Sequence, residues 1–121
     1  MKISKSQFIK GHQCPKALWY SLYRKDLKPP VSVAQQKLFD QGHEVGELAK
    51  KLFPKGLEIK ADYWESEKAV ELTLEAIKEG RSTLFEATAQ SSDGLYARID
   101  ILNKAGNLWD LIEVKSSTSV K

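Results

Sequence analysis

Residues 95–116, LYARIDILNKAGNLWDLIEVKS, alternate apolar and polar side chains on both sides of the tetrapeptide KAGN. A period of two is typical of β-strands, and a short link with Gly and Asn is typical of a hairpin turn. We therefore predict antiparallel strands at 95–103 and 108–116. In the first strand, one face would hold Leu95, Ala97, Ile99 and Ile101, and the other Tyr96, Arg98 and Asp100.

Helix signals occupy most of the chain that precedes this hairpin. The spacing of apolar residues and of helix start and stop signals predicts helices at 4–11, 15–23, 33–53 and 66–80. A Ser-x-x-Gln capping box begins two of them, at Ser4 and Ser32. The helix at 66–80 is amphipathic and has Val70, Leu74 and Ile77 on its apolar side. Its acidic row is expected to face water and comprises Glu67, Glu71, Glu75 and Glu79.

Further strands are predicted at 57–61 and 83–90. Helices followed by a meander indicate the α+β (mixed α/β) class, with N-terminal helices packed on a small, mostly antiparallel sheet. A chain of 121 residues suits one core, so we expect a single domain over 1–121. Within it, a basic helical arm would span 1–31 and a helix with a three-stranded meander would span 32–121.

Composition excludes several classes of protein. The start, MKISKSQFIKG, lacks the apolar core of a secretion signal, and no stretch is long and apolar enough to cross a membrane. The single cysteine, Cys14, excludes an internal disulfide framework. These features predict a cytoplasmic protein without a membrane partner.

The N-terminal arm is unusually basic. Residues 1–30 hold seven Lys/Arg and one Asp, a net charge of +6, against +3 for the whole chain. Aromatic residues are interleaved with these cations, as in proteins that neutralise phosphates and stack on bases. The nucleic-acid-binding candidates are Lys16, Trp19, Arg24 and Lys25. The equally weighted alternative is that the aromatic residues belong to the core and the lysines form a solvated face.

The hairpin brings two carboxylates towards one face of the sheet. A two- or four-residue connection places Asp100 across from Leu111, with Glu113 a diagonal neighbour about 7–8 Å away. A three-residue connection would send them to opposite faces. Paired carboxylates suit Mg²⁺ or Mn²⁺. Lys115, on the same face, would orient or deprotonate a metal-bound water or steady charge on a phosphoryl oxygen.

An E-x-K triplet by itself has little specificity, because chance supplies one in about every two chains of this length. A second triplet is present at Glu58-Ile59-Lys60, on another predicted strand. Thirteen residues before Glu58 stands Val45, whereas Asp100 stands thirteen residues before Glu113. This difference favours the later triplet as the functional one.

His43 lies between two glycines in the predicted helix 33–53. Glycine inside a helix costs about 1 kcal/mol relative to alanine, so we expect Gly42 and Gly46 to permit close approach of another element. His43 is a candidate metal ligand, and the alternative is a half-buried core histidine beside Phe39. Two further residue groups have less specific roles. Glu86 would either join the acidic site or face water, and His12 with Cys14 is too sparse a pair to indicate zinc.

A histidine on a helix, then an aspartate on a strand, then E-x-K on the next strand is similar to the motif order of PD-(D/E)XK nucleases. The resemblance is to the RecB-like branch, which includes CRISPR-associated exonucleases. It rests on GHEVGELA, GLYARIDIL and LIEVKSS, and extends to ISKSQFIKGHQCPKALWY, which resembles the start of uncharacterised bacterial members. Ile99 stands where the family's name-giving motif has proline.

The resemblance implies a partial restriction-endonuclease-like core and a site for Mg²⁺ or Mn²⁺. The implied metal ligands are His43, Asp100, Glu113 and the carbonyl of Val114, and Lys115 would be the catalytic lysine. Many relatives hold an iron–sulfur cluster through one cysteine like Cys14 and three more near the C-terminus. Those three are missing here, as are the Q-x-x-x-Y helix and later strands. We therefore expect the N-terminal part of a longer nuclease, and a cluster only in the full-length protein.

Three hypotheses follow. The first is a metal-dependent DNA nuclease in repair, recombination or defence, with its activity expected in the full-length protein. The second is a non-catalytic nucleic-acid-binding module that uses the basic aromatic arm. The third is a protein-interaction scaffold without a nucleic acid partner.

Overall fold

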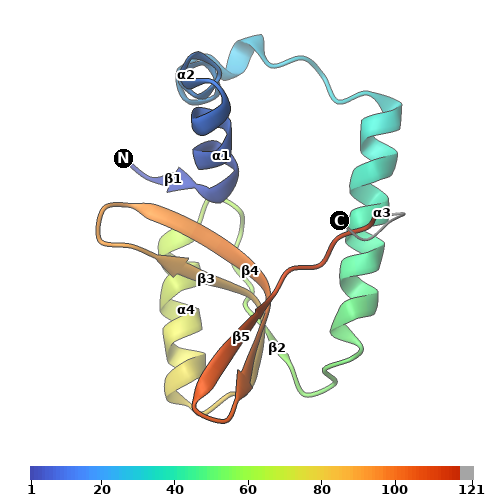
Figure 1. Cartoon of the computed structure of the whole chain (residues 1–121), viewed down its shortest axis with the longest axis vertical. Helices are drawn as coiled ribbons and strands as arrows, with labels where there is room; N and C mark the ends of the chain where they lie inside the picture. Colours follow the sequence, from blue (N-terminus) through green and yellow to red (C-terminus); the bar gives the residue numbers. More distant parts are fainter. Residues whose placement is uncertain (118–121) are drawn as a thin grey trace.

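The computed structural model describes residues 1–117, so residues 118–121 of the expected domain lie outside the described residues. It is an α+β fold with four α-helices and a five-strand mixed sheet (Figure 1). The helices are α1 (Lys5–Gln13), α2 (Pro15–Tyr23), α3 (Val33–Lys50) and α4 (Ser66–Lys78), with a 3₁₀ turn at Lys25–Leu27. The strands are β1 (Ile3–Ser4), β2 (Leu57–Glu58), β3 (Thr83–Gln90), β4 (Leu95–Ala105) and β5 (Leu108–Ile112).

The predicted antiparallel meander forms the centre of the sheet. β3 pairs with β4 and β4 pairs with β5, both antiparallel, through long ladders. Two short strands add parallel pairings that were not predicted: β1 along β4 and β2 along β3. β1 and β5 both pair with β4, β1 near its beginning and β5 near its end.

The turn between β4 and β5 has two residues, and Gly106 adopts a φ of +63°, which glycine tolerates without strain. Leu102 therefore pairs with Leu111, and the expected pairing of Asp100 with Leu111 is wrong. Continuing the ladder past Ile101 and Ile112 brings Glu113 opposite Asp100. The parity of the prediction is preserved, but β5 ends at Ile112 rather than at 116, so Glu113 and Lys115 follow the strand.

The alternation of faces in β4 is interrupted beside Asp100. Phe85 pairs with Ile101 and Ala87 with Ile99, whereas Glu86, between these pairs, has a φ of +58°. A positive φ is strained for a residue with a side chain and breaks the regular pleat. As a result Ile99 and Leu102 both pack in the core, whereas Ile101 lines a cavity. The prediction that Ile99 and Ile101 share one face is therefore wrong.

Helix α4 covers the sheet, and it does so through small residues. Its buried residues are Ala69, Thr73 and Ala76, which pack with Leu84 and other core residues. The Thr73 hydroxyl donates to the carbonyl of Ala69 at 2.7 Å and accepts from the backbone N–H of Thr88 at 3.0 Å. Small side chains permit this close approach of helix and strand. The predicted apolar side, Val70, Leu74 and Ile77, therefore does not form the buried face, although the acidic row is exposed as expected.

Helix α3 lies apart from the sheet on the side opposite α4 (Figure 1). Ser32 caps it by accepting from the N–H of Gln35 at 3.1 Å, as predicted, but it ends at Lys50 instead of 53. Like α1 and α2 it has no buried residue, so the expected packing of the N-terminal helices on the sheet does not hold for α3, and the helix that buries residues against the sheet is α4. Within residues 1–117, no helix is long and apolar enough to cross a membrane.

Candidate active site

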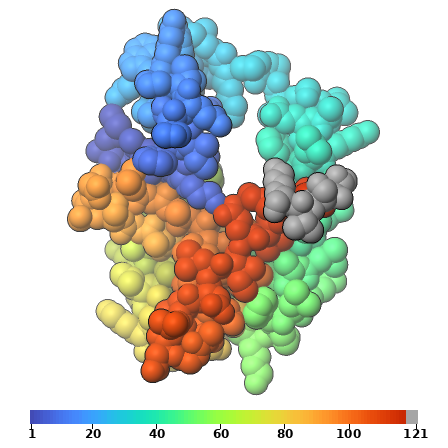
Figure 2. Space-filling view, viewed as in Figure 1, coloured from blue at the N-terminus to red at the C-terminus, as the bar shows by residue number. Residues whose placement is uncertain are grey.

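A cavity of about 610 Å³ opens between α3, the segment after β2 and the interrupted part of β4. The space-filling view shows that the molecule is also open between the N-terminal helices and α3 (Figure 2). Charges of both signs line the cavity. Its acidic residues are Glu47, Glu58, Asp62, Glu65, Glu86 and Asp100, and its basic residues are Lys50, Lys60, Lys68 and Arg98.

Three of the predicted metal-site residues line this cavity: His43, Asp100 and Val114. They come from α3, from β4 and from the segment after β5. The Asp100 carboxylate accepts a hydrogen bond from the backbone N–H of Val114 at 2.8 Å, which orients it and ties the segment to β4. His43 is exposed, and so is Phe39, so the interpretation of His43 as a half-buried core residue is wrong.

Glu113 lies at the edge of this arrangement and is held by two lysines. Lys5 Nζ, from the first turn of α1, lies 2.7 and 2.6 Å from the two carboxylate oxygens, and Lys115 Nζ lies 2.7 Å from Oε1. Hydrogen bonds from Lys115 and Lys5 lower the pKa of Glu113 to about 2. The bond to Glu113 in turn raises the pKa of Lys115. No local sequence pattern connects Lys5 with Glu113, because 108 positions separate the two residues.

The donor chemistry of the site fits a hard divalent cation, since it combines carboxylates, an imidazole and a backbone carbonyl. In residues 1–117, however, no three His, Cys, Asp or Glu side chains are gathered closely enough to hold a metal. His43 and Asp100 line the cavity, whereas both oxygens of Glu113 are engaged by lysine ammonium groups. A metal bound by all three residues would require Glu113 to exchange a lysine for the metal.

Glu86 joins the acidic site. It lines the cavity from β3 and has the positive φ, and it stands between the pairs Phe85–Ile101 and Ala87–Ile99, where the ladder leaves out Asp100. Burial raises the pKa of Glu86, and the nearby Asp100 raises it further, against the opposite effects of Lys50 and Arg98. Of the two roles considered for Glu86, the structure favours membership of the site over an outward, water-facing position.

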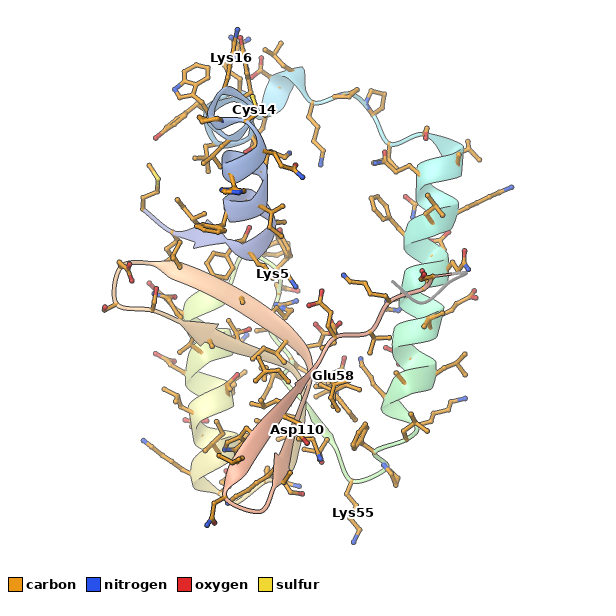
Figure 3. The ribbon with its side chains drawn as sticks, viewed as in Figure 1. Lys5, Cys14, Lys16, Lys55, Glu58 and Asp110 are labelled. Atoms are coloured by element: carbon orange, nitrogen blue, oxygen red, sulfur yellow. The ribbon has the colours of Figure 1, made fainter. Side chains whose placement is uncertain are left out.

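The second E-x-K triplet lines the same cavity. Glu58 and Lys60 both contribute to it, and Glu58 accepts from Lys50 Nζ at 2.9 Å (Figure 3). Lys50 also bonds Glu47 at 2.8 Å and lies 5.8 Å from the ring centre of Phe85. Its side chain is only 16% exposed. Burial lowers the pKa of Lys50, but its bonds to Glu47 and Glu58 outweigh that effect and raise it.

No other element packs closely against the two glycines beside His43. A Cβ at Gly46 would meet nothing within 4 Å, and one at Gly42 would make an ordinary contact of 3.8 Å with Ser116. Both glycines line the cavity, so their missing side chains leave space beside His43. The predicted close approach occurs instead at Gly56, where a Cβ would lie 2.2 Å from the ring of Phe85.

The aromatic residues of the N-terminal arm lie on the surface. Trp19 is 51% exposed and packs edge-on against Tyr20 at 5.3 Å and tilted against Tyr23 at 5.6 Å. Lys16 Nζ lies 6.0 Å from the centre of the Tyr20 ring. The alternative that these aromatic residues belong to the core is therefore wrong.

The remaining arm candidates differ in their availability. Arg24 bonds Asp26 through two nitrogens, with distances from 2.7 to 3.1 Å, and Lys25 is exposed. Cys14 is an exposed thiol at the start of α2. One thiol does not fit an iron–sulfur cluster, which is held by four protein ligands, so this chain does not supply such a site by itself.

Comparison with known proteins identifies no relative. No family model, no curated protein and no solved structure matches this chain.

Proposed function

We propose that this chain belongs to a Mg²⁺- or Mn²⁺-dependent DNA nuclease that acts in repair, recombination or defence. The supporting observation is that His43, Asp100 and Val114, from three separate segments, line one cavity. The order of motifs along the chain supports the same proposal, including the resemblance to PD-(D/E)XK nucleases and a partial restriction-endonuclease-like core.

In this proposal, His43, Asp100, Glu113 and the carbonyl of Val114 hold the metal. When bound, the metal supplies a Lewis acid and an activated water for phosphodiester hydrolysis. Asp100 is oriented for this role by the N–H of Val114. Lys115, two residues after Glu113, would orient or deprotonate a metal-bound water or steady negative charge on a phosphoryl oxygen.

The test is nuclease activity of the full chain and its variants on single- and double-stranded DNA, with Mg²⁺, Mn²⁺ or EDTA. We expect Asp100→Asn and Lys115→Ala each to lower the rate by more than about 100-fold, because the first removes a charged metal ligand and the second removes the catalytic lysine. Asp110→Asn and Lys55→Ala are matched controls, since both residues are exposed and lie outside the cavity (Figure 3). Equal and measurable rates in the wild type and in all four variants would contradict the proposal.

A second candidate function is a non-catalytic nucleic-acid-binding module. The observation that favours it is the exposed cluster of Trp19, Tyr20 and Tyr23 beside Lys16. Exposed rings next to cations suit stacking of unpaired bases and neutralisation of phosphates.

This module would bind DNA with or without EDTA and with strong dependence on salt. Charge reversal of Lys16, Arg24 and Lys25 should weaken binding. It should also make the negative slope of log K against log salt less steep, by about 1 for each lost phosphate contact. Reversal of Lys51, Lys55 and Lys78, which are exposed elsewhere, controls for the change in net charge. Equal binding by the two triple variants, measured by fluorescence anisotropy, would exclude the arm as the DNA-binding surface.

A further inference from the structure

The contact between Lys5 and Glu113 joins the beginning of the described chain to the segment after β5. Lys5 Nζ lies within 2.7 Å of both carboxylate oxygens, and both side chains are about half exposed. Lys5 lies at the base of α1 (Figure 3). The ammonium group thus occupies a position between the two oxygens where a divalent cation would bind a carboxylate.

The segment that carries Lys5 is held in place by specific local structure. β1 pairs with β4, and the N–H of Ile3 donates to the carbonyl of Gly94 at 3.0 Å. Gly94 has a φ of +91°, and a Cβ there would lie 2.4 Å from the carbonyl oxygen of Met1, so only glycine fits this position. Ser4 and Gln7 then form a complete capping box at the start of α1. These contacts direct Lys5 towards Glu113.

We propose that Lys5 is a built-in competitor of the metal: its ammonium group occupies the Glu113 carboxylate, and a divalent cation must displace it in order to bind there. The inference rests on the proposed metal site. Lys5 thus acts through Glu113, and it does not itself bind the metal. It also accounts for Glu113 being engaged by lysines while His43 and Asp100 line the cavity.

Such competition is reciprocal, because two cations that exclude each other from one carboxylate weaken each other's binding by the same factor. Metal at Glu113 should therefore loosen the segment 1–13, and loss of the Lys5 charge should tighten the binding of metal. Exposed ion pairs contribute at most about 1 kcal/mol, so the expected change is about two- to fivefold.

The first experiment measures the affinity of the chain for Mn²⁺ by isothermal titration calorimetry. Lys5→Gln should bind Mn²⁺ about two- to fivefold more tightly than the wild type. Lys2→Gln is the matched control, because Lys2 belongs to the same segment and pairs with Glu67, outside the cavity, at 2.6 Å. It removes the same charge, so equal affinities of the two variants would overturn the role of Lys5.

The second experiment measures amide hydrogen exchange in residues 1–13. Mn²⁺ should speed this exchange in the wild type, and Glu113→Gln should speed it without metal. Unchanged exchange in both cases would overturn the inference even where Mn²⁺ binds. Failure of the proposed function has a different signature: neither the wild type nor Lys5→Gln binds Mn²⁺, or Asp100→Asn binds it as well as the wild type.

Discussion

Glu86 has a strained backbone. Its partial burial also disfavours the charged form of its carboxyl group. Its φ of +58° interrupts the pleat of two strands at the cavity, where the ladder leaves out Asp100. Strain of this kind costs on the order of 1–3 kcal/mol and persists where the surrounding structure imposes it. At this residue, strain and like-charge repulsion coincide with the candidate metal site.

We expect Glu86→Gln to raise the free energy of unfolding at neutral pH by about 1 kcal/mol, because the variant removes a charge that burial disfavours. Glutamine keeps the backbone strain, so the comparison isolates the charge. A raised carboxyl pKa means that the folded state binds the proton more tightly. The charged form therefore lowers stability above that pKa, and the advantage of Glu86→Gln should shrink as the pH falls through it and be lost below the ordinary pKa of glutamate.

The measurement for Glu86 is urea denaturation of the wild type and Glu86→Gln at several pH values. Glu71→Gln serves as the control, because Glu71 is exposed on α4. A stability difference that is independent of pH would show that the charge of Glu86 is not its source.

At the scale of single elements, α3 has little tertiary packing, a feature it shares with α1 and α2, which also have no buried residue. It has a side-chain cap at Ser32 but none of its residues is buried, so its stability comes mainly from its own sequence. Glycines in such a helix have a direct effect on its formation. Both Gly42 and Gly46 reduce helix propensity, and both leave space in the cavity wall beside His43.

Gly46→Ala should stabilise α3 by about 1 kcal/mol, since a Cβ at this position meets nothing within 4 Å. The gain should appear in urea denaturation followed by far-UV circular dichroism. Gly80→Ala is the contrasting control: space is also available there, but Gly80 has a φ of +84°, and alanine is strained at that angle. We therefore expect Gly80→Ala to destabilise. Loss of stability in Gly46→Ala would mean that the cavity wall requires glycine.

At the scale of the whole molecule, the sheet is the meeting point of segments that are distant in sequence. β1 and β5 lie along β4, and the segment after β5 is tied to β4 by Asp100 and to α1 by Lys5. α3 supplies the opposite wall of the cavity without packing on the sheet. Binding of a cation at Glu113 would therefore affect the N-terminal segment as well as the cavity.

Local signals in the sequence determined which elements form. The capping box at Ser4 and the cap at Ser32 begin helices as predicted, and β3 has its predicted bounds. These features depend on hydrogen bonds and periodicity within a few residues, which a sequence displays directly. The parity that relates Asp100 to Glu113 is local for the same reason, since one short turn sets it.

Tertiary structure decided which side chains meet. Lys5 reaches Glu113 and the Glu58 triplet reaches the cavity through packing of segments that no periodicity connects. It also decided the buried face of α4, where small residues displaced the larger apolar ones because the helix lies close to β3. Side-chain patterns report what each element could bury or bind. The partners across a gap of a hundred residues are set by the way the elements pack, and that packing completes the candidate site.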